Sequence, residues 1–425
     1  MKKASDRILR RSVLSVLVTA SLYTSQVMAF TDEVTADNSP ITDETVENGT
    51  QVVRNDGETK NITVGEGGKQ TIGSGGNTEK TLIKNGGEQV VNARGTTTGT
   101  IIETGGLQTV YSQGNAIGTE IKTDGVQNVN YGGKADQTII YGTQNISTEG
   151  QSTNATIEDG GVQNVNSGGT ATGTTINDGG KQNVSGTSTG TKIETGGVQT
   201  VNSGGKDEKA VIYGTQDVLA EGTATGATIN DGGKQNVSGT STGTKIEKGG
   251  VQTVYARGTA EGTTIKLGGT LNVEDGGQAT GVEQQEGAAL IATTDKNTVV
   301  SGNNTRGEFS INAGQADKVL LENGGRLTVV SDTSATSTTL NKGGELIVNS
   351  GGTATGTTIN DGGKQNVSGT STGTKIETGG VQTVNSGGKD EKAVIYGTQD
   401  VLAEGTATGA TINDGGKQNV SGTST

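Results

Sequence analysis

The chain of 425 residues contains no cysteine, no histidine and no tryptophan, and it has a single proline. Disulfide bonds and Cys/His metal sites are therefore excluded. Hydrophobic residues make up 28% of the chain and aromatic residues 2%, which is too little apolar bulk for a compact globule of this length. Beyond residue 29 no run of 18 apolar residues occurs, so no segment there can span a membrane as a helix.

Glycine, by contrast, is abundant at 75 residues, and the net charge is −13. This composition alone would be typical of a disordered chain, but a strict repeat argues against disorder. Between residues 53 and 420 the pattern Ile-x-x-Gly-Gly-x-Gln-x-Val recurs about twenty times, mostly in steps of 17 or 19 residues. A fixed period near 20 residues indicates a solenoid, in which stacked repeats line up a narrow continuous core.

Each repeat has the spacing of β-strands. In Gln-x-Val and Thr-x-Ile the first and third residues share one face of a strand. These short Val/Ile/Thr-rich segments alternate with Gly-Gly, Asp-Gly and Asn-Gly pairs, which supply the positive φ that tight corners require. Apolar residues do not recur at helical spacing, and glycine interrupts every segment. We therefore predict an all-β solenoid of about twenty rungs, each of 17–19 residues.

The glutamine that stands two residues before each valine is the most informative position of the repeat. Alternation predicts that it points toward the core with the valine. A buried amide needs hydrogen-bond partners, and the equivalent glutamines of the adjacent rungs can provide them as an amide ladder. Where glutamine is lost, leucine replaces it, at Leu271, Leu327 and Leu346. The alternative is a solvated glutamine at a strand corner.

The N-terminal part of the chain differs from the repeats. Residues 1–29 have a basic start, a short apolar core and small residues near Ala29, which is typical of a secretory signal peptide cleaved after Ala29. Residues 30–52 contain six acidic side chains and no Lys or Arg. We interpret residues 30–52 as an acidic leader and N-terminal cap, since an open solenoid end would expose strand edges.

The repeats fall into two arrays. Residues 53–281 form the first, residues 282–318 break the pattern and are interpreted as an irregular rung or bend, and residues 319–425 form the second. Residues 348–425 repeat residues 165–242 without a single difference. Such identity indicates a recent duplication or an assembly artefact, and we expect the chain to be truncated in mid-repeat.

No catalytic, cofactor-binding or metal-binding residue stands out, because the acidic residues recur at equivalent turns instead of forming one singular site. The main alternative function is a β-helical polysaccharide-processing enzyme, which would need clustered carboxylates and aromatic platforms. Calcium bound at Asn-Asp-Gly-Gly corners and ice bound on threonine ladders are further alternatives. The acidic balance disfavours nucleic acid as a partner.

Two stretches carry a family resemblance. Residues 160–176 read Gly-Gly-x-Gln-x-Val-x-x-Gly-Gly-x-Ala-x-x-Thr-x-Ile, and residues 307–311 with 315–329 form the second stretch, Gly-Glu-Phe-Ser-Ile followed by Gln-Ala-Asp-Lys-Val-Leu-Leu-Glu-Asn-Gly-Gly-Arg-Leu-Thr-Val. Both resemble the passenger repeats of AIDA-type self-associating autotransporters, including antigen 43. The resemblance covers about residues 45–425.

This resemblance implies a right-handed parallel β-helix displayed on a Gram-negative cell surface, with no enzymatic activity and no cofactor. It implies that the chain binds itself, rod to rod between cells, in autoaggregation and biofilm growth, or binds a host surface or matrix. Some members of the family are O-heptosylated on Ser or Thr. The resemblance also implies a C-terminal β-barrel translocator in the full-length protein, which this sequence does not contain.

Overall fold

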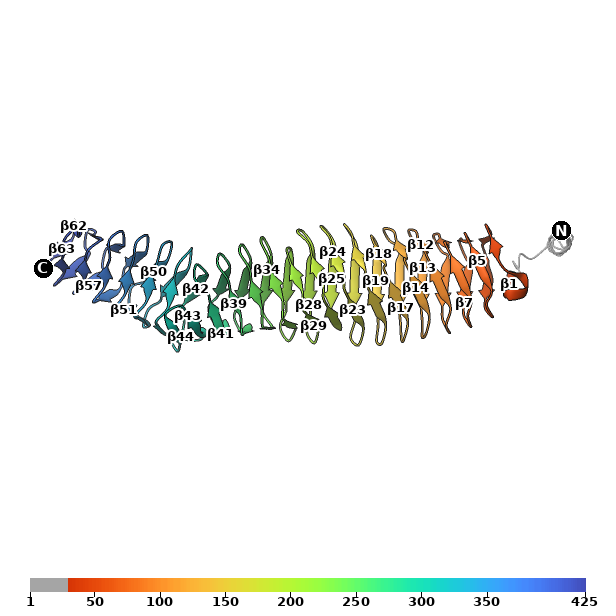
Figure 1. Cartoon of the computed structure of the whole chain (residues 1–425), viewed down its shortest axis with the longest axis horizontal. Helices are drawn as coiled ribbons and strands as arrows, with labels where there is room; N and C mark the ends of the chain where they lie inside the picture. Colours follow the sequence, from red (N-terminus) through yellow and green to blue (C-terminus); the bar gives the residue numbers. More distant parts are fainter. Residues whose placement is uncertain (1–29) are drawn as a thin grey trace, which may run out of the picture.

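The computed structural model describes residues 30–425, which form one rod of stacked coils (Figure 1). Apart from one short 3-10 helix, η1 (Ala36–Asn38), the regular elements of this range are strands, numbered β1 to β63. No helix within residues 30–425 is long and apolar enough to cross a membrane. The predicted signal peptide lies outside the described residues. The prediction of an all-β solenoid is confirmed.

One wall of the rod, sheet A, contains one strand from each of 21 coils. Its strands pair in parallel and in register, so that Gln108 lies beside Gln127 and Val110 beside Val129. The strands of sheet A are β1 (Phe30–Val34), β4 (Gly49–Val53), β7 (Lys69–Ile72), β10 (Glu88–Val91), β13 (Leu107–Val110), β16 (Val126–Val129), β19 (Thr143–Ile146), β22 (Val162–Val165), β25 (Lys181–Val184), β28 (Val198–Val201), β31 (Thr215–Val218), β34 (Lys234–Val237), β37 (Val251–Val254), β40 (Thr270–Val273), β42 (Ala289–Thr293), β47 (Arg326–Val329), β50 (Glu345–Val348), β53 (Lys364–Val367), β56 (Val381–Val384), β59 (Thr398–Val401) and β62 (Lys417–Val420).

The rest of each coil forms the opposite walls. After β22 the chain turns into β23 (Thr170–Thr172) and β24 (Thr175–Ile176) before the next corner returns it to sheet A. Strands equivalent to β23 and β24 make up sheet B, which has 36 strands. In the C-terminal array the two-residue strands form a separate sheet C: β46 (Leu320–Leu321), β49 (Thr339–Leu340), β52 (Thr358–Ile359), β55 (Lys375–Ile376), β58 (Val394–Ile395) and β61 (Thr411–Ile412).

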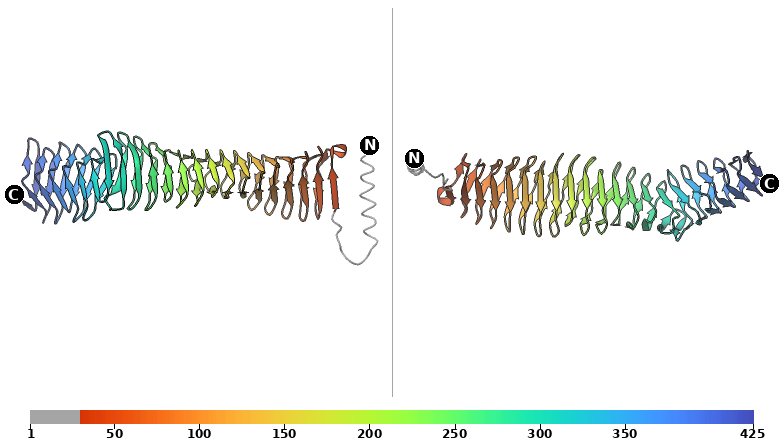
Figure 2. Two further views of the ribbon diagram at one scale, coloured as in Figure 1. Left: turned by 90° about the horizontal axis from the view of Figure 1, so that it is seen from below. Right: turned by 180° about the vertical axis from the view of Figure 1, so that it is seen from behind.

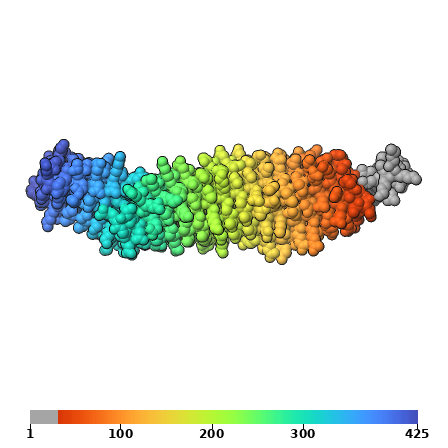
Figure 3. All heavy atoms as spheres, viewed as in Figure 1, coloured from red at the N-terminus to blue at the C-terminus, as the bar shows by residue number. Residues whose placement is uncertain are grey.

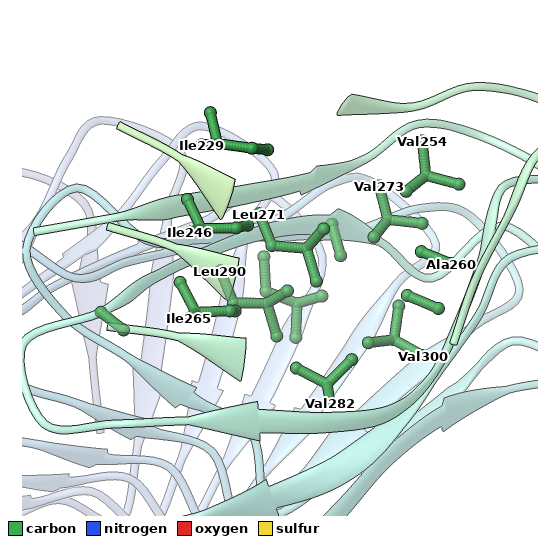
Figure 4. Packing of buried hydrophobic residues seen from close by; sticks show 14 of the residues in the cluster. Ile229, Ile246, Val254, Ala260, Ile265, Leu271, Val273, Val282, Leu290 and Val300 are labelled. Atoms are coloured by element: carbon green, nitrogen blue, oxygen red, sulfur yellow. The ribbon is translucent and has the colours of Figure 1, made fainter. Parts of the chain in front are cut away.

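The apolar core is a pair of columns along the rod axis. In the first array the repeat isoleucines, such as Ile229, Ile246 and Ile265, stack one above another with no exposed surface. Figure 4 shows these residues beside the second column, which includes Val254 and Val273. Each coil contributes only a few aliphatic side chains, so a single coil buries too little apolar surface to be stable alone, and stability comes from stacking.

The two glycines of a Gly-Gly corner serve different purposes. Gly179 has a φ of 73°, whereas its neighbour Gly180 has no positive φ. A Cβ on Gly180 would lie 2.8 Å from the carbonyl oxygen of Ile157 in the preceding coil. The Gly-Gly pattern in the sequence indicated a positive φ for both glycines of the corner. The structure instead assigns that requirement to the first glycine and a close approach between coils to the second.

Residues 30–52 are part of the stack. Strand β1 pairs in parallel with β4, with Phe30 beside Gly49, while β2 (Ile41–Thr42) and β3 (Thr45–Val46) pair with the next coil in sheet B. The segment that the sequence suggests as leader and cap therefore forms the first described coil of the rod.

Residues 282–318 contain the only antiparallel pairings among the described strands. Here β43 (Val299–Asn304) pairs with β44 (Gly307–Asn312), and β44 pairs with β45 (Gln315–Asp317), both antiparallel. In sheet A, β42 pairs directly with the next strand, β47. Over the same stretch of chain, sheet B contains three successive strands, β43, β44 and β45. At about 4.8 Å per strand, one wall becomes roughly 10 Å longer than the other. The rod bends at this place (Figure 2) because the extra strands act as a wedge.

Candidate functional surfaces

The glutamines of sheet A form two ladders inside the rod, a first from Gln51 to Gln252 and a second from Gln365 to Gln418, which confirms the sequence prediction and rejects the solvated alternative. From Gln70 to Gln252 each side chain has no exposed surface. Each Nε2 donates to the Oε1 of the glutamine in the preceding coil, at distances between 2.6 and 2.8 Å. In many coils the glutamine amide also hydrogen-bonds to Thr or Ser hydroxyls. For example, Gln163 Nε2 donates to the Ser152 hydroxyl, and the Thr174 hydroxyl donates to Gln163 Oε1.

The amides of the first ladder all point in one direction, and its ends are also satisfied. At the N-terminal end Gln51 donates to the carboxylate of Glu44 at 3.0 Å. At the other end Gln252 accepts from Thr263, and the next coils hold Leu271 and Leu290 in register. Sequence reasoning found Leu271 but missed Leu290, because the repeat spacing around residue 290 is irregular.

A shorter ladder of asparagine amides lies on the outer face of sheet A. Asn145 donates to Asn128, Asn164 to Asn145, and Asn183 to Asn164, each at 2.9 Å. These side chains are half-buried, and the ladder uses only one N–H and one lone pair of each inner amide. The outer face of sheet A therefore offers hydrogen-bonding groups to a second molecule.

Short corners carry a repeated unit of lysine, glutamate and tyrosine. Where the corner shrinks to Tyr-Gly, the Nζ of Lys192 lies 5.8 Å from the ring centroid of Tyr213 and forms an ion pair with Glu194. The hydrogen bond to Glu194 raises the pKa of Lys192 above its usual value. The same contacts recur at Lys122, Glu120 and Tyr141 and at Lys375, Glu377 and Tyr396. Both partners of each ion pair are partly exposed to solvent, so these surface ion pairs add little stability.

An open recess of about 690 Å³ lies beside the break in the repeat. Arg257, Asp275, Gln278, Asp295 and Asn297 line it, and the Asp295 carboxylate accepts the Asn297 backbone N–H at 2.9 Å. Within residues 30–425 no three Asp, Glu, His or Cys side chains gather closely enough to hold a metal ion. The repeat acids Asp178, Asp231, Asp361 and Asp414 stay at equivalent corners of separate coils, as their spacing predicts.

Known proteins match this chain both in sequence and in fold. The family described as "Adhesin of bacterial autotransporter system, probable stalk" matches residues 141–197, 239–288, 301–363 and 339–380. The crystal structure of a TibC-catalyzed hyper-glycosylated fragment of TibA superposes with a TM-score of 0.54 at 37% sequence identity. That match covers 62% of this chain and 96% of the TibA fragment.

The chain belongs to the AIDA-type autotransporter adhesins. A further relative of this AIDA-type passenger is the probable autotransporter YpjA of Escherichia coli (strain K12), 51% identical over 63 residues. These 63 residues are 15% of the passenger and 4% of the length of YpjA. The proteins that resemble the passenger are adhesins and autotransporters, which favours a non-enzymatic role over polysaccharide processing.

Proposed function

We propose that this passenger is exported with the help of a signal peptide cleaved after Ala29, is displayed on the cell surface and joins cells by rod-to-rod contact. The observation that supports the proposal best is the stack of 21 coils, which forms one long rod (Figure 3). Its walls present the same polar residue types at equivalent positions of successive coils. Each exposed contact contributes less than about 1 kcal/mol. Many such contacts per rod, and many rods per cell, provide avidity.

The outer face of sheet A suggests where two rods meet. Across four successive coils, from β13 to β22, it carries no charged residue. We call this region the uncharged strip, which consists of Leu107, Val126, Asn128, Thr143, Asn145, Val162 and Asn164; Thr109 lies in the same face but is only 5% exposed. Four rungs at about 4.8 Å make a flat patch roughly 19 Å long. A flat face of valine, threonine and asparagine can pack against another such face without burying unpaired charge.

The charges that flank the uncharged strip favour an antiparallel pair. Glu88 stands one coil before the strip, where it forms an ion pair with Lys69 of the preceding coil at 3.0 Å, and Lys181 stands one coil after the strip, in the same column of the sheet. In an antiparallel face-to-face pair, a two-fold axis through the centre of the strip places Glu88 opposite Lys181 of the second rod. A parallel pair would place Lys181 against Lys181, which is repulsive. Antiparallel rods are also the arrangement that connects two facing cells.

A charge-exchange experiment tests this pairing on cells that display the passenger fused to a translocator barrel. We expect Lys181→Glu to slow settling several-fold, because the new carboxylate of each rod then lies opposite Glu88 of the other rod in both symmetric contacts. The double variant Glu88→Lys/Lys181→Glu should recover most of the settling rate, and the part that it does not recover reflects the lost ion pair between Glu88 and Lys69. Surface expression of each variant, measured with an antibody, is the control.

The outcomes separate two questions. If wild-type cells stay dispersed, self-association is wrong and adherence to a host surface or matrix becomes the better proposal. If wild-type cells settle and Lys181→Glu settles equally fast, cells aggregate through another wall; if Lys181→Glu is slow and the double variant stays as slow, the antiparallel pairing of Glu88 with Lys181 is wrong. The TibA fragment is hyper-glycosylated. We propose that outward threonines of sheet B, such as Thr170 and Thr172, accept sugars in this passenger, which mass spectrometry of surface-exported protein would detect.

A further inference from the structure

Two aspartates lie inside the rod, where the other coils have small or neutral side chains. Asp207, in β29 (Lys206–Glu208), and Asp390, in β57 (Lys389–Glu391), are each 1% exposed. The neighbouring coils place Ser188 and Ala224 beside Asp207 in the same interior column. In sequence, the run Lys-Asp-Glu looks like an exposed charged loop. The register of sheet B instead turns the aspartate inward and the lysine and glutamate outward.

Each buried carboxyl is held by ladder glutamines, Asp207 by those of the first glutamine ladder and Asp390 by those of the second. Gln199 donates to Oδ1 of Asp207 at 2.8 Å and Gln216 donates to Oδ2 at 2.9 Å. The Ser188 hydroxyl is a third partner, and it can accept a hydrogen bond from the protonated acid. Asp390 has the same environment, with Gln382 and Gln399 both at 2.9 Å and Ser371 as the hydroxyl. Both protonation states of the carboxyl can therefore be bonded within the rod.

The elements around Asp207 provide no positive charge inside the rod. Strands β26 (Thr187–Thr189), β28 and β32 (Thr223–Thr225) contain no ionisable side chain, and Asp217 of β31 lies on the outer face. Lys206 and Glu208 are exposed on the outside of β29. Burial raises the pKa of Asp207 to about 6, although the glutamine hydrogen bonds oppose the shift. Burial likewise raises the pKa of Asp390.

We propose that Asp207 and Asp390 are proton-binding positions that set how firmly their own coils stay closed. Protonation at acidic pH raises the free energy needed to open each of the two coils locally, and ionisation at neutral pH lowers it. The sign follows from linkage: the folded coil binds the proton more tightly than the open coil does, so stability rises as pH falls from above 6 toward 4. At neutral pH the ionised carboxylate is buried without a cation, and its coil is weaker than its neighbours.

Hydrogen–deuterium exchange of the intact chain tests this proposal coil by coil. After correction for intrinsic exchange rates, amides of β28, β29 and β31 should be protected about 25-fold more at pH 4.5 than at pH 7.5. Amides of β19 and β22, whose coils contain no buried acid and do not contact Asp207, provide the internal control and should change little. The coil of Asp390 should respond in the same direction.

The variant Asp207→Ser imitates the residue that the chain itself uses at position 188. It should remove the pH response of its own coil, raise protection of that coil at pH 7.5, and leave the response of the Asp390 coil intact. Equal protection of the Asp207 and control coils at both pH values in the wild type would refute the proposal even if the variant failed to fold. A pH response that persisted in Asp207→Ser would refute it as well.

Discussion

Replacing Gly197 by alanine is expected to open the rod locally. Gly197 is the second glycine of a corner, and a Cβ there would lie 2.6 Å from the carbonyl oxygen of Ile176 and 3.1 Å from that of Glu194. Both obstacles are backbone atoms, and the nearer one belongs to the strand pairing between coils, so neither can move without loosening that pairing. We expect a loss of about 3 kcal/mol or more in the stability of that coil.

Gly190 provides the matched control for this substitution. It lies in the same coil with a φ of 66°, but a Cβ at this position would have nothing within 4 Å. Gly190→Ala should therefore cost only the backbone strain, about 1 kcal/mol. Because a solenoid need not unfold in one step, limited proteolysis and hydrogen exchange of the affected coil are the appropriate measurements. Equal effects of the two variants would show that the contact with the preceding coil is unimportant.

Breaking the glutamine ladder in its middle is expected to cost more than breaking it at its end. In Gln163→Leu the leucine fills the volume, but Gln182 Nε2 loses its acceptor at 2.6 Å and Thr174 loses its own at 3.2 Å. An amide N–H left unsatisfied inside the rod costs about 1–3 kcal/mol. We expect a loss of about 2 kcal/mol for the coil, measured by its hydrogen-exchange protection.

The control for the ladder is Gln252→Leu. No glutamine donates to Gln252, because the next coil has Leu271 in register, and Gln235 keeps its bonds from Ser241 and Thr244. Gln235 Oε1 and Ser241 Oγ each lose the N–H of Gln252 but stay hydrogen-bonded to other groups, while the Thr263 hydroxyl loses its acceptor and can rotate. We expect a cost below about 1 kcal/mol. If Gln252→Leu were as costly as Gln163→Leu, the ladder would be stabilised by side-chain packing and not by its chain of amides.

Local pattern was enough to predict much of this molecule. Alternation in Gln-x-Val placed Gln163 and Val165 on one face, and leucine at 271, 327 and 346 indicated that the face is the interior. Both inferences depend only on the two-residue period of a strand, which neighbouring coils cannot change. The positive φ at Gly179 followed from turn chemistry in the same way.

Three features needed the register between coils. The need for a residue without a Cβ at position 180 can be seen only once the Ile157 carbonyl of the preceding coil is placed beside it. The inward position of Asp207 appears only when β29 is aligned with its neighbours. Glu88 and Lys181 flank the uncharged strip in one column of sheet A, and only the register between coils shows that they share this column.

The sequence by itself determined the repeating coil, its strands and corners, and the ladder within it, because each of these is set by residues a few positions apart. The sequence also indicated an irregular rung or bend at residues 282–318, but only the tertiary structure decided that β43, β44 and β45 pair antiparallel there and lengthen one wall. Periodicity cannot encode that choice, since the direction in which a strand pairs depends on which neighbour the chain meets after it leaves the repeat. The tertiary structure also brought two acidic side chains into the interior, because burial is a property of the stack and not of one coil.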